Sequence, residues 1–270
     1  KGKPAGKTEE AVKAVKAKKT TKTAQKAEKK VSEKTVKTAE KKQGTTTATE
    51  KVEKAVKQAI LDILDEEDEL VLHGYTNSNA GYEDVRQAVA ESLNERFGTA
   101  FAAKNITMTV GAAGGLNVIL KALLNPGDEV ITFAPYFGEY RSYVNNFDGV
   151  LVEISPNTVD FQPKLDEFEA KITPKTKAVI VNTPNNPTGV IYSDATLTRL
   201  ADILREKSAE FGTEIVLISD EPYRELAYDG AVVPYVTKYY ANTVVCYSYS
   251  KSLSLPGERI GYLVIPDELA

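Results

Sequence analysis

Residues 178–189 read Ala-Val-Ile-Val-Asn-Thr-Pro-Asn-Asn-Pro-Thr-Gly, an apolar run that changes abruptly into a polar loop. The apolar half, Ala178–Asn182, favours a buried β-strand, and the two prolines and the glycine predict a rigid loop after it. An Asn held on such a loop can donate its side-chain amide to a ligand oxygen. The loop could instead only start the next helix, but a plain turn does not require so elaborate a sequence.

Six further β-rich runs flank this stretch, and helical segments separate several of them. Such alternation indicates a three-layer α/β/α fold, in which helices cover both faces of a mostly parallel, seven-stranded sheet. Ligands of open sheets bind beyond the carboxyl ends of the strands, so we expect the polar motifs to meet there. The expected strands are Ile106–Val110, Glu129–Phe133, Val150–Ile154, Ala178–Asn182, Ile215–Ser219, Val244–Tyr249 and Ile260–Ile265, and the expected helices are Tyr82–Phe97, Gly114–Leu124, Gly138–Asn146, Leu165–Lys171 and Asp194–Phe211.

The N-terminal part of the sequence has a different composition. Residues 1–44 contain fifteen Lys and five Glu without Arg, Asp or an aromatic residue, a local charge of +10 in a chain of net charge −4. We predict that residues 1–49 form a flexible or transiently helical extension, because they lack the apolar surface for a core. This extension is either a remnant added for expression or an electrostatic tether to nucleic acid or another anionic surface.

The folded domain is predicted to extend from residue 50 to residue 270. It begins where apolar residues recur at helical spacing along one face: Val52, Val56, Ala59, Ile60, Ile63 and Leu64. The single Cys246 excludes a disulfide framework, and with the single His73 it argues against a metal site. We expect a cytoplasmic protein without a membrane partner, since no apolar run could cross a bilayer or act as a secretory signal.

Three more polar motifs follow predicted strands. Residues 110–115 (Val-Gly-Ala-Ala-Gly-Gly) would let backbone N–H groups approach a phosphate, or would form only a tight connection. In residues 218–223 (Ile-Ser-Asp-Glu-Pro-Tyr) a carboxylate at the end of a buried strand requires a positive partner, either a ligand or a structural Arg or Lys. In residues 248–251 (Ser-Tyr-Ser-Lys) the lysine has either a chemical role or a place on the surface.

Together and in this order, the motifs resemble the large domain of the class I and II aminotransferases, pyridoxal-phosphate enzymes with the aspartate aminotransferase fold. The resemblance extends from about Val52 to Ala270. Its distinguishing features are Asn-Asn-Pro-Thr-Gly at 185–189, Ser-Asp-Glu-Pro-Tyr at 219–223, and Ser-x-Ser-Lys at 248–251 with an Arg eight residues after the lysine. It implies an enzyme whose cofactor is pyridoxal 5'-phosphate.

The resemblance implies catalytic roles for three residues. Lys251 would hold the cofactor as a Schiff base and would then move the substrate α-proton. Asp220 would pair with the pyridinium nitrogen and keep the ring an effective electron sink. Tyr223, together with Asn186, would hydrogen-bond to the phenolic oxygen of the cofactor.

The resemblance also implies how the rest of the cofactor is held. The backbone amides of Ala112 and Ala113, with Ser248 and Arg259, would bind the phosphate, and Arg259 would supply the fixed charge. Phe137 would stack on the ring, although a core aromatic at the start of a helix would look the same.

Gly111 and Ser250 complete the cofactor-binding set, and Tyr75 aligns with the tyrosine that reaches the phosphate of the neighbouring subunit. The implied assembly is therefore a homodimer. The Lys-rich stretch stands where the family has an N-terminal arm, and the sequence stops at Ala270, where the family's small domain would follow. That domain supplies the arginine for the substrate α-carboxylate, so we expect a truncated chain to turn over poorly.

The implied reaction moves an amino group between an L-amino acid and a 2-oxo acid. Two other functions stay open. One is a lyase or decarboxylase on the same fold, because the cofactor stabilises a carbanion whichever bond breaks. The other is a non-catalytic binding module, like the aminotransferase-like domains of bacterial transcription regulators. Specific nucleic-acid binding is not expected, since the basic extension has neither the apolar core of a winged helix nor aromatic side chains.

Overall fold

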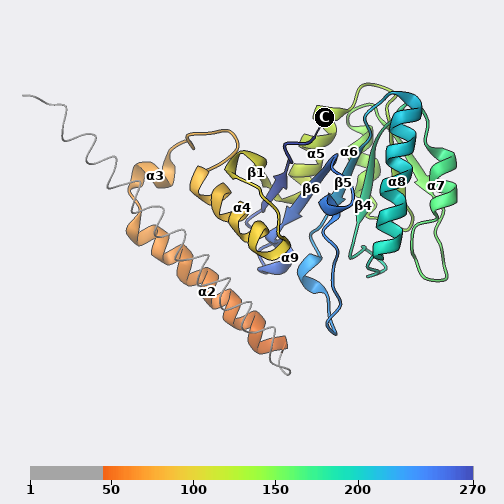
Figure 1. The fold of residues 1–270 in the computed structure, drawn as a ribbon. Coiled ribbons are helices and arrows are strands. Elements are labelled where there is room, and N and C mark those ends of the chain that lie inside the picture. The colour runs from red at the N-terminus through yellow and green to blue at the C-terminus, as the bar shows by residue number, and fades with distance from the viewer. Residues whose placement is uncertain (1–44, 270) are drawn as a thin grey trace, which may run out of the picture. The chain divides into compact units, whose positions relative to one another are not determined.

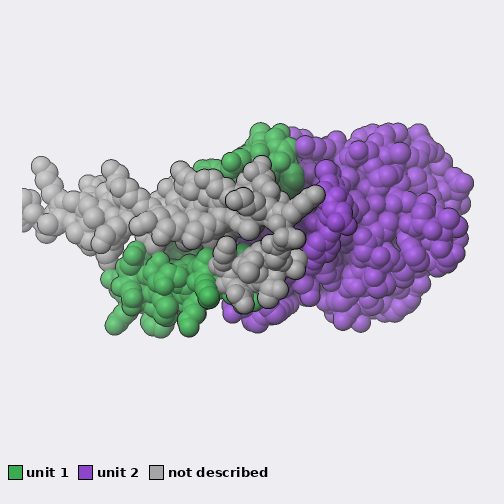
Figure 2. Space-filling view, turned by 90° about the horizontal axis from the view of Figure 1, so that it is seen from below, with its two compact units in different colours: residues 1–104 green, residues 105–270 purple. Residues whose placement is uncertain are grey.

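The computed structural model describes residues 45–269, with side chains from residue 52 onward. The chain forms two compact units, one ending at Lys104 and the other beginning at Asn105, which Figure 2 distinguishes by colour. The predicted basic extension over residues 1–44 lies outside the described residues. The domain boundary that we expected after residue 49 rests on composition and on the helical spacing of apolar residues, and it stays a prediction.

The first unit is helical and contains α2 (Thr45–Glu66), α3 (Glu69–His73) and α4 (Glu83–Phe97). The backbone of α2 begins at Thr45, a few residues before the predicted start. Its apolar face is not part of a buried core, because Ile60, Ile63 and Leu64 are 45%, 43% and 58% exposed. Periodicity predicts the helix and its face correctly, but it contains no information about what covers that face.

The second unit is built on a sheet whose strands lie in the order β1-β7-β6-β5-β4-β2-β3 (Figure 1). The strand β7 runs antiparallel to both of its neighbours, and all other pairs are parallel. The predicted mostly parallel, seven-stranded sheet is therefore confirmed. The strands are β1 (Ile106–Val110), β2 (Glu129–Phe133), β3 (Val150–Ile154), β4 (Thr176–Asn182), β5 (Val216–Asp220), β6 (Thr243–Ser248) and β7 (Ile260–Val264).

Helices cover both faces of this sheet, so the three-layer prediction is also confirmed (Figure 1). Alternate residues of a strand face opposite sides. In β4, Val179 and Val181 therefore join the core under α7 and α8, whereas Ala178 and Ile180 join the core under α5 and α6. The helices of this unit are α5 (Gly111–Leu123), α6 (Glu139–Asn145), α7 (Leu165–Lys171), α8 (Asp194–Phe211) and α9 (Tyr249–Ser252), and the 3-10 turns are η1 (Ala103–Asn105), η2 (Arg224–Leu226) and η3 (Val236–Lys238).

Several boundaries differ from the prediction by one to three residues: those of α4, α5, α6, β4, β5, β6 and β7. Two of these differences lie next to polar motifs. Helix α5 starts at Gly111 instead of Gly114, so the expected loop is the first helical turn, entered through a Gly111 φ of +66° that favours glycine. Strand β6 ends at Ser248 instead of Tyr249, because the Ser248 hydroxyl accepts a hydrogen bond from the backbone N–H of Ser250 at 3.2 Å. This cap starts α9 and outweighs the strand preference of the tyrosine.

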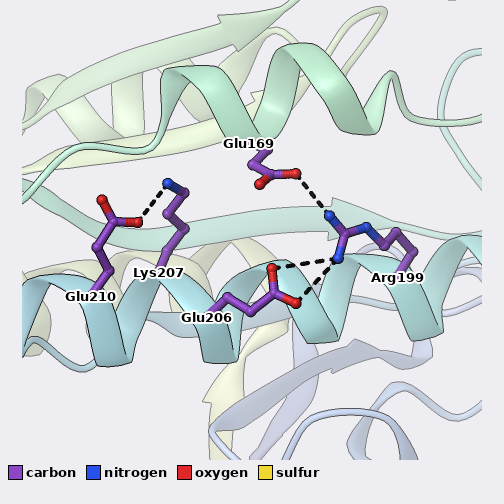
Figure 3. Close-up of polar contacts among 5 residues, drawn as sticks. All are labelled: Glu169, Arg199, Glu206, Lys207 and Glu210. Atoms are coloured by element: carbon purple, nitrogen blue, oxygen red, sulfur yellow. Dashed lines mark hydrogen bonds and ion pairs between the residues drawn. The ribbon is translucent and has the colours of Figure 1, made fainter.

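Ion pairs at the surface connect α7 to α8 and also connect residues within α8, as Figure 3 shows. Arg199 contacts Glu169 of α7 at 2.8 Å and Glu206 at 3.4 Å, and Lys207 contacts Glu210 at 2.7 Å. Pairs this exposed contribute at most about 1 kcal/mol each, so the buried apolar core holds the helices to the sheet. Within residues 45–269, no helix is both long and apolar enough to cross a membrane.

Candidate active site

The polar motifs of the second unit converge on one edge of the sheet. Asp220 is the last residue of β5 and pairs in register with Cys246 of β6, so Lys251 follows β6 at the same edge. Asn186 lies in the loop after β4, the parallel neighbour of β5. Because β7 is antiparallel, its first residue lies at this edge and brings Arg259 beside the ends of β1 and β6.

Asp220 is a buried carboxylate for which the described part of the chain supplies no cationic partner. Its Oδ2 accepts a hydrogen bond of 2.5 Å from the Tyr140 hydroxyl, and its Oδ1 is buried without a hydrogen-bond partner among the described residues. Burial raises the pKa of Asp220 to about 7, the Tyr140 hydrogen bond lowers it, and the nearby Glu221 raises it. The Oδ1 atom is therefore available for a donor that lies outside the chain.

The adjacent carboxylate, Glu221, is fully engaged. Its Oε2 accepts from Nε of Arg224 at 2.6 Å, and its Oε1 accepts from the Ser219 hydroxyl at 2.8 Å. The Arg224 guanidinium also donates to two backbone carbonyls, at 3.0 and 2.9 Å. The structural arginine that the motif could require thus belongs to Glu221, and Asp220 is left for a ligand.

Asn186, Tyr223 and Lys251 lie together around the Tyr223 ring. The Asn186 side-chain amide donates to the Tyr223 hydroxyl at 3.1 Å, and Lys251 Nζ lies 5.9 Å from the centre of that ring. The loop is fixed by Asn182, whose Oδ1 accepts from the backbone N–H of Asn186 at 2.6 Å and whose amide donates to the Asp220 carbonyl at 2.8 Å. Lys251 is exposed on α9, so its amine is accessible to a ligand.

The first turn of α5 and the Arg259 guanidinium lie together where β1, β7 and β6 meet. The first turn of α5 includes Gly111, Ala112 and Ala113, and its N–H groups have no acceptors within the helix. A Cβ on Gly111 would lie 3.1 Å from an Arg259 Nη2, so the guanidinium lies against this turn. Arg259 has a φ of +56°, an uncommon conformation for a residue other than glycine that often marks functional sites. Ser248 ends β6 two strands away from β1.

Phe137 and Tyr140 approach the same edge from α6 and the turn before it. The two rings are in edge contact, with centroids 5.7 Å apart. Tyr140 was not singled out by the sequence, although its spacing of three residues from Phe137 is the spacing that places two side chains on one helix face. Tyr75 is fully exposed in the first unit, and its predicted role in a neighbouring subunit stays a prediction.

The family model described as aminotransferase class I and II matches residues 42–270. The chain belongs to this family. Its sequence is 36% identical over 188 residues to the probable aspartate/prephenate aminotransferase of Thermus aquaticus, an alignment covering 69% of this chain and 48% of that protein.

Among solved structures of the family, an amino transferase from Eubacterium rectale matches with a TM-score of 0.78 and 51% identity, over 79% of this chain and 54% of that chain. The Thermus thermophilus aspartate aminotransferase with maleate matches with a TM-score of 0.71 and 32% identity, over 79% and 53%. The chain therefore spans about half the length of the relatives that it matches. These likenesses confirm the fold and the family that the motifs predicted.

Proposed function

We propose that this chain is the cofactor-binding part of a pyridoxal-phosphate-dependent aminotransferase, which moves an amino group between an L-amino acid and a 2-oxo acid. The observation that carries the proposal is the buried Asp220 Oδ1 without a partner among residues 45–269, at the same sheet edge as the accessible amine of Lys251. Membership of the family and the aminotransferase names of its relatives support the same reaction.

The residues at the sheet edge fit pyridoxal phosphate group by group. Asp220 Oδ1 has no donor among the residues that the structure describes, and a protonated pyridine nitrogen would supply one. The α5 N-terminus with Arg259 fits a phosphate, since fixed positive charge and free N–H groups meet there. Lys251 offers a primary amine to the aldehyde carbon. When bound, this cofactor supplies an electron sink for bond cleavage at the substrate α-carbon.

Each side chain would then have a defined task. Asp220 would keep a proton on the ring nitrogen, because an ionised carboxylate favours a cation beside it. The Tyr223 hydroxyl, which accepts a hydrogen bond from the Asn186 amide at 3.1 Å, would donate to the phenolic oxygen. Lys251 would hold the cofactor through its amine, and as a free amine it would accept the substrate α-proton as a general base.

Residues 50–270 form the cofactor-binding domain in this proposal, and the working protein is a cytoplasmic homodimer in which Tyr75 reaches the neighbouring site. Its partners are small molecules, a donor amino acid and an acceptor 2-oxo acid. Three of the relatives are named for aspartate and prephenate, which makes aspartate the first donor to assay.

An absorbance titration with pyridoxal phosphate tests the proposal. The wild type should gain a Lys-dependent band near the visible edge, and Lys251→Arg should not, because a guanidinium keeps the charge but cannot condense with the aldehyde. Lys121→Ala is the matched control, since this exposed lysine also lies over an aromatic ring, 5.6 Å from the centre of Phe147. An identical band in wild type and Lys251→Arg would refute the assignment.

A further inference from the structure

We propose that Tyr140 is a positioning residue, which holds Asp220 charged and turned so that Oδ1 meets the ring nitrogen of the cofactor. This inference rests on the proposed function and assigns a role to a residue that the sequence motifs do not include. Tyr140 touches neither the phenolic oxygen nor the amine in the proposed reaction, so it acts through Asp220.

The geometry of this contact leaves the carboxylate one orientation. Tyr140 is completely buried, and its hydroxyl lies 2.5 Å from Asp220 Oδ2. A carboxylate is planar, so a fixed Oδ2 also fixes the direction in which Oδ1 points. The Tyr140 ring is itself held between Phe137, at 5.7 Å in edge contact, and Tyr136, which stacks at 6.2 Å. The Tyr140 ring, and with it the hydroxyl, is thus held in place by packing against the turn that precedes α6.

The charges around Asp220 give the hydrogen bond an electrostatic consequence. The titratable groups that face this carboxylate come from α6, β5 and its following turn, and β6: Tyr140, Tyr143, Glu221, Tyr223 and Cys246. Burial and Glu221 both raise the pKa of Asp220, and the Tyr140 hydrogen bond opposes them. Tyr140 therefore favours the ionised form that a protonated ring nitrogen requires.

Removing the Tyr140 hydroxyl should lower the affinity for a cofactor only if that cofactor has a ring nitrogen. In Tyr140→Phe, Oδ2 loses its donor, so the pKa of the buried Asp220 rises and the cofactor-free protein keeps a proton there to higher pH than the wild type does. Binding pyridoxal phosphate must then move that proton to the ring nitrogen, at a cost. An analogue in which a CH group replaces the ring nitrogen makes no such demand on Asp220, so its affinity should not change.

The experiment compares dissociation constants for pyridoxal phosphate and its 1-deaza analogue, both of which carry the aldehyde. Tyr140→Phe should weaken pyridoxal phosphate about tenfold, the size expected for one hydrogen bond to a charged group, and leave the analogue unchanged. Tyr240→Phe is the matched control, because it removes another buried hydroxyl. That hydroxyl donates to the carbonyl of Ile215 at 2.8 Å, and Ile215 comes just before the first residue of β5, at the end of the strand opposite to Asp220. It should weaken neither ligand.

Equal weakening of both ligands by Tyr140→Phe would overturn the inference, because it would reduce Tyr140 to a packing residue. If the wild type shows no Lys251-dependent band at all, the proposed function fails first and this inference fails with it. Circular dichroism checks that Tyr140→Phe folds. If Tyr140→Phe does not fold, 3-fluorotyrosine at position 140 is the second variant, because it keeps the hydroxyl as a more acidic donor. It should increase the affinity for pyridoxal phosphate but not for the 1-deaza analogue. An unchanged affinity for pyridoxal phosphate would count against the inference.

Discussion

The burial of Asp220 should make the stability of the cofactor-free protein depend on pH in a way that Asp220→Asn removes. The pKa of this carboxyl is about 7 in the folded chain, against an ordinary value of 3.8. Between these values the folded state keeps a proton that the unfolded state has released, so the free energy of unfolding falls as pH rises. At 1.36 kcal/mol per pH unit, the wild type should lose about 3 kcal/mol between pH 5 and pH 8 relative to a chain without this group.

Asp220→Asn has two opposite effects on the free energy of unfolding. It does not titrate, so the pH-dependent loss disappears. Its amide nitrogen would replace an oxygen that has no partner among residues 45–269, and a buried unpaired donor costs about 1–3 kcal/mol at every pH. Asp220→Asn should therefore be less stable than the wild type at pH 5 and equally or more stable at pH 8.

Urea unfolding followed by circular dichroism at several pH values measures this difference. Lys251→Ala is the control, because it alters the same site but keeps Asp220 and should keep the wild-type pH dependence. Parallel stability curves for wild type and Asp220→Asn from pH 5 to pH 8 would show that the carboxylate is not held at a cost, and the reasoning from its burial would be refuted.

Two further changes separate structural groups from chemical ones. Arg224→Met should lower the free energy of unfolding by about 3–5 kcal/mol, because it leaves Glu221 charged and buried. Arg199→Met, on the exposed face of α8, should lower it by less than about 1 kcal/mol. Similar melting temperatures for the two variants would contradict this. Gly261→Ala should lower the free energy of unfolding by about 3 kcal/mol and weaken phosphate binding, because its Cβ would lie 2.4 Å from the Tyr247 carbonyl oxygen. Gly257→Ala is the control: there is open space around Gly257, so this variant should have the melting temperature of the wild type.

Local pattern was enough to predict most of the fold. The strand limits of β1, β2 and β3 and the helix limits of α7 and α8 match the prediction, because each segment has one dominant period between clear breakers. The rule that ligands of open sheets bind beyond the carboxyl ends of the strands predicted the edge that Asp220 and Lys251 share, and the resemblance to the family supplied their roles. One of the boundaries that differ from the prediction is at Tyr249, where a serine hydroxyl caps a helix that no periodicity describes.

Contacts between distant segments were beyond the sequence. The Tyr140 hydroxyl meets Asp220 across 80 residues of chain, and only the packing of α6 on the sheet decides which tyrosine does so. Likewise, two adjacent acids end β5, and their order in the chain does not tell which one Arg224 neutralises. The sequence likewise predicts that one face of α2 is apolar, but it does not show what this face packs against.

The reversed strand β7 also has a consequence for synthesis on the ribosome. β1 lies at one border of the sheet that the described residues form, where it pairs with β7, so Ile106 finds its partner Val264 about 160 residues later. A nascent chain can stack β2 to β6 early, but β1 joins this sheet only after β7 has been made. The corner between Gly111 and Arg259 is therefore assembled after the edge that carries Asp220, and phosphate binding there should report that β7 has docked.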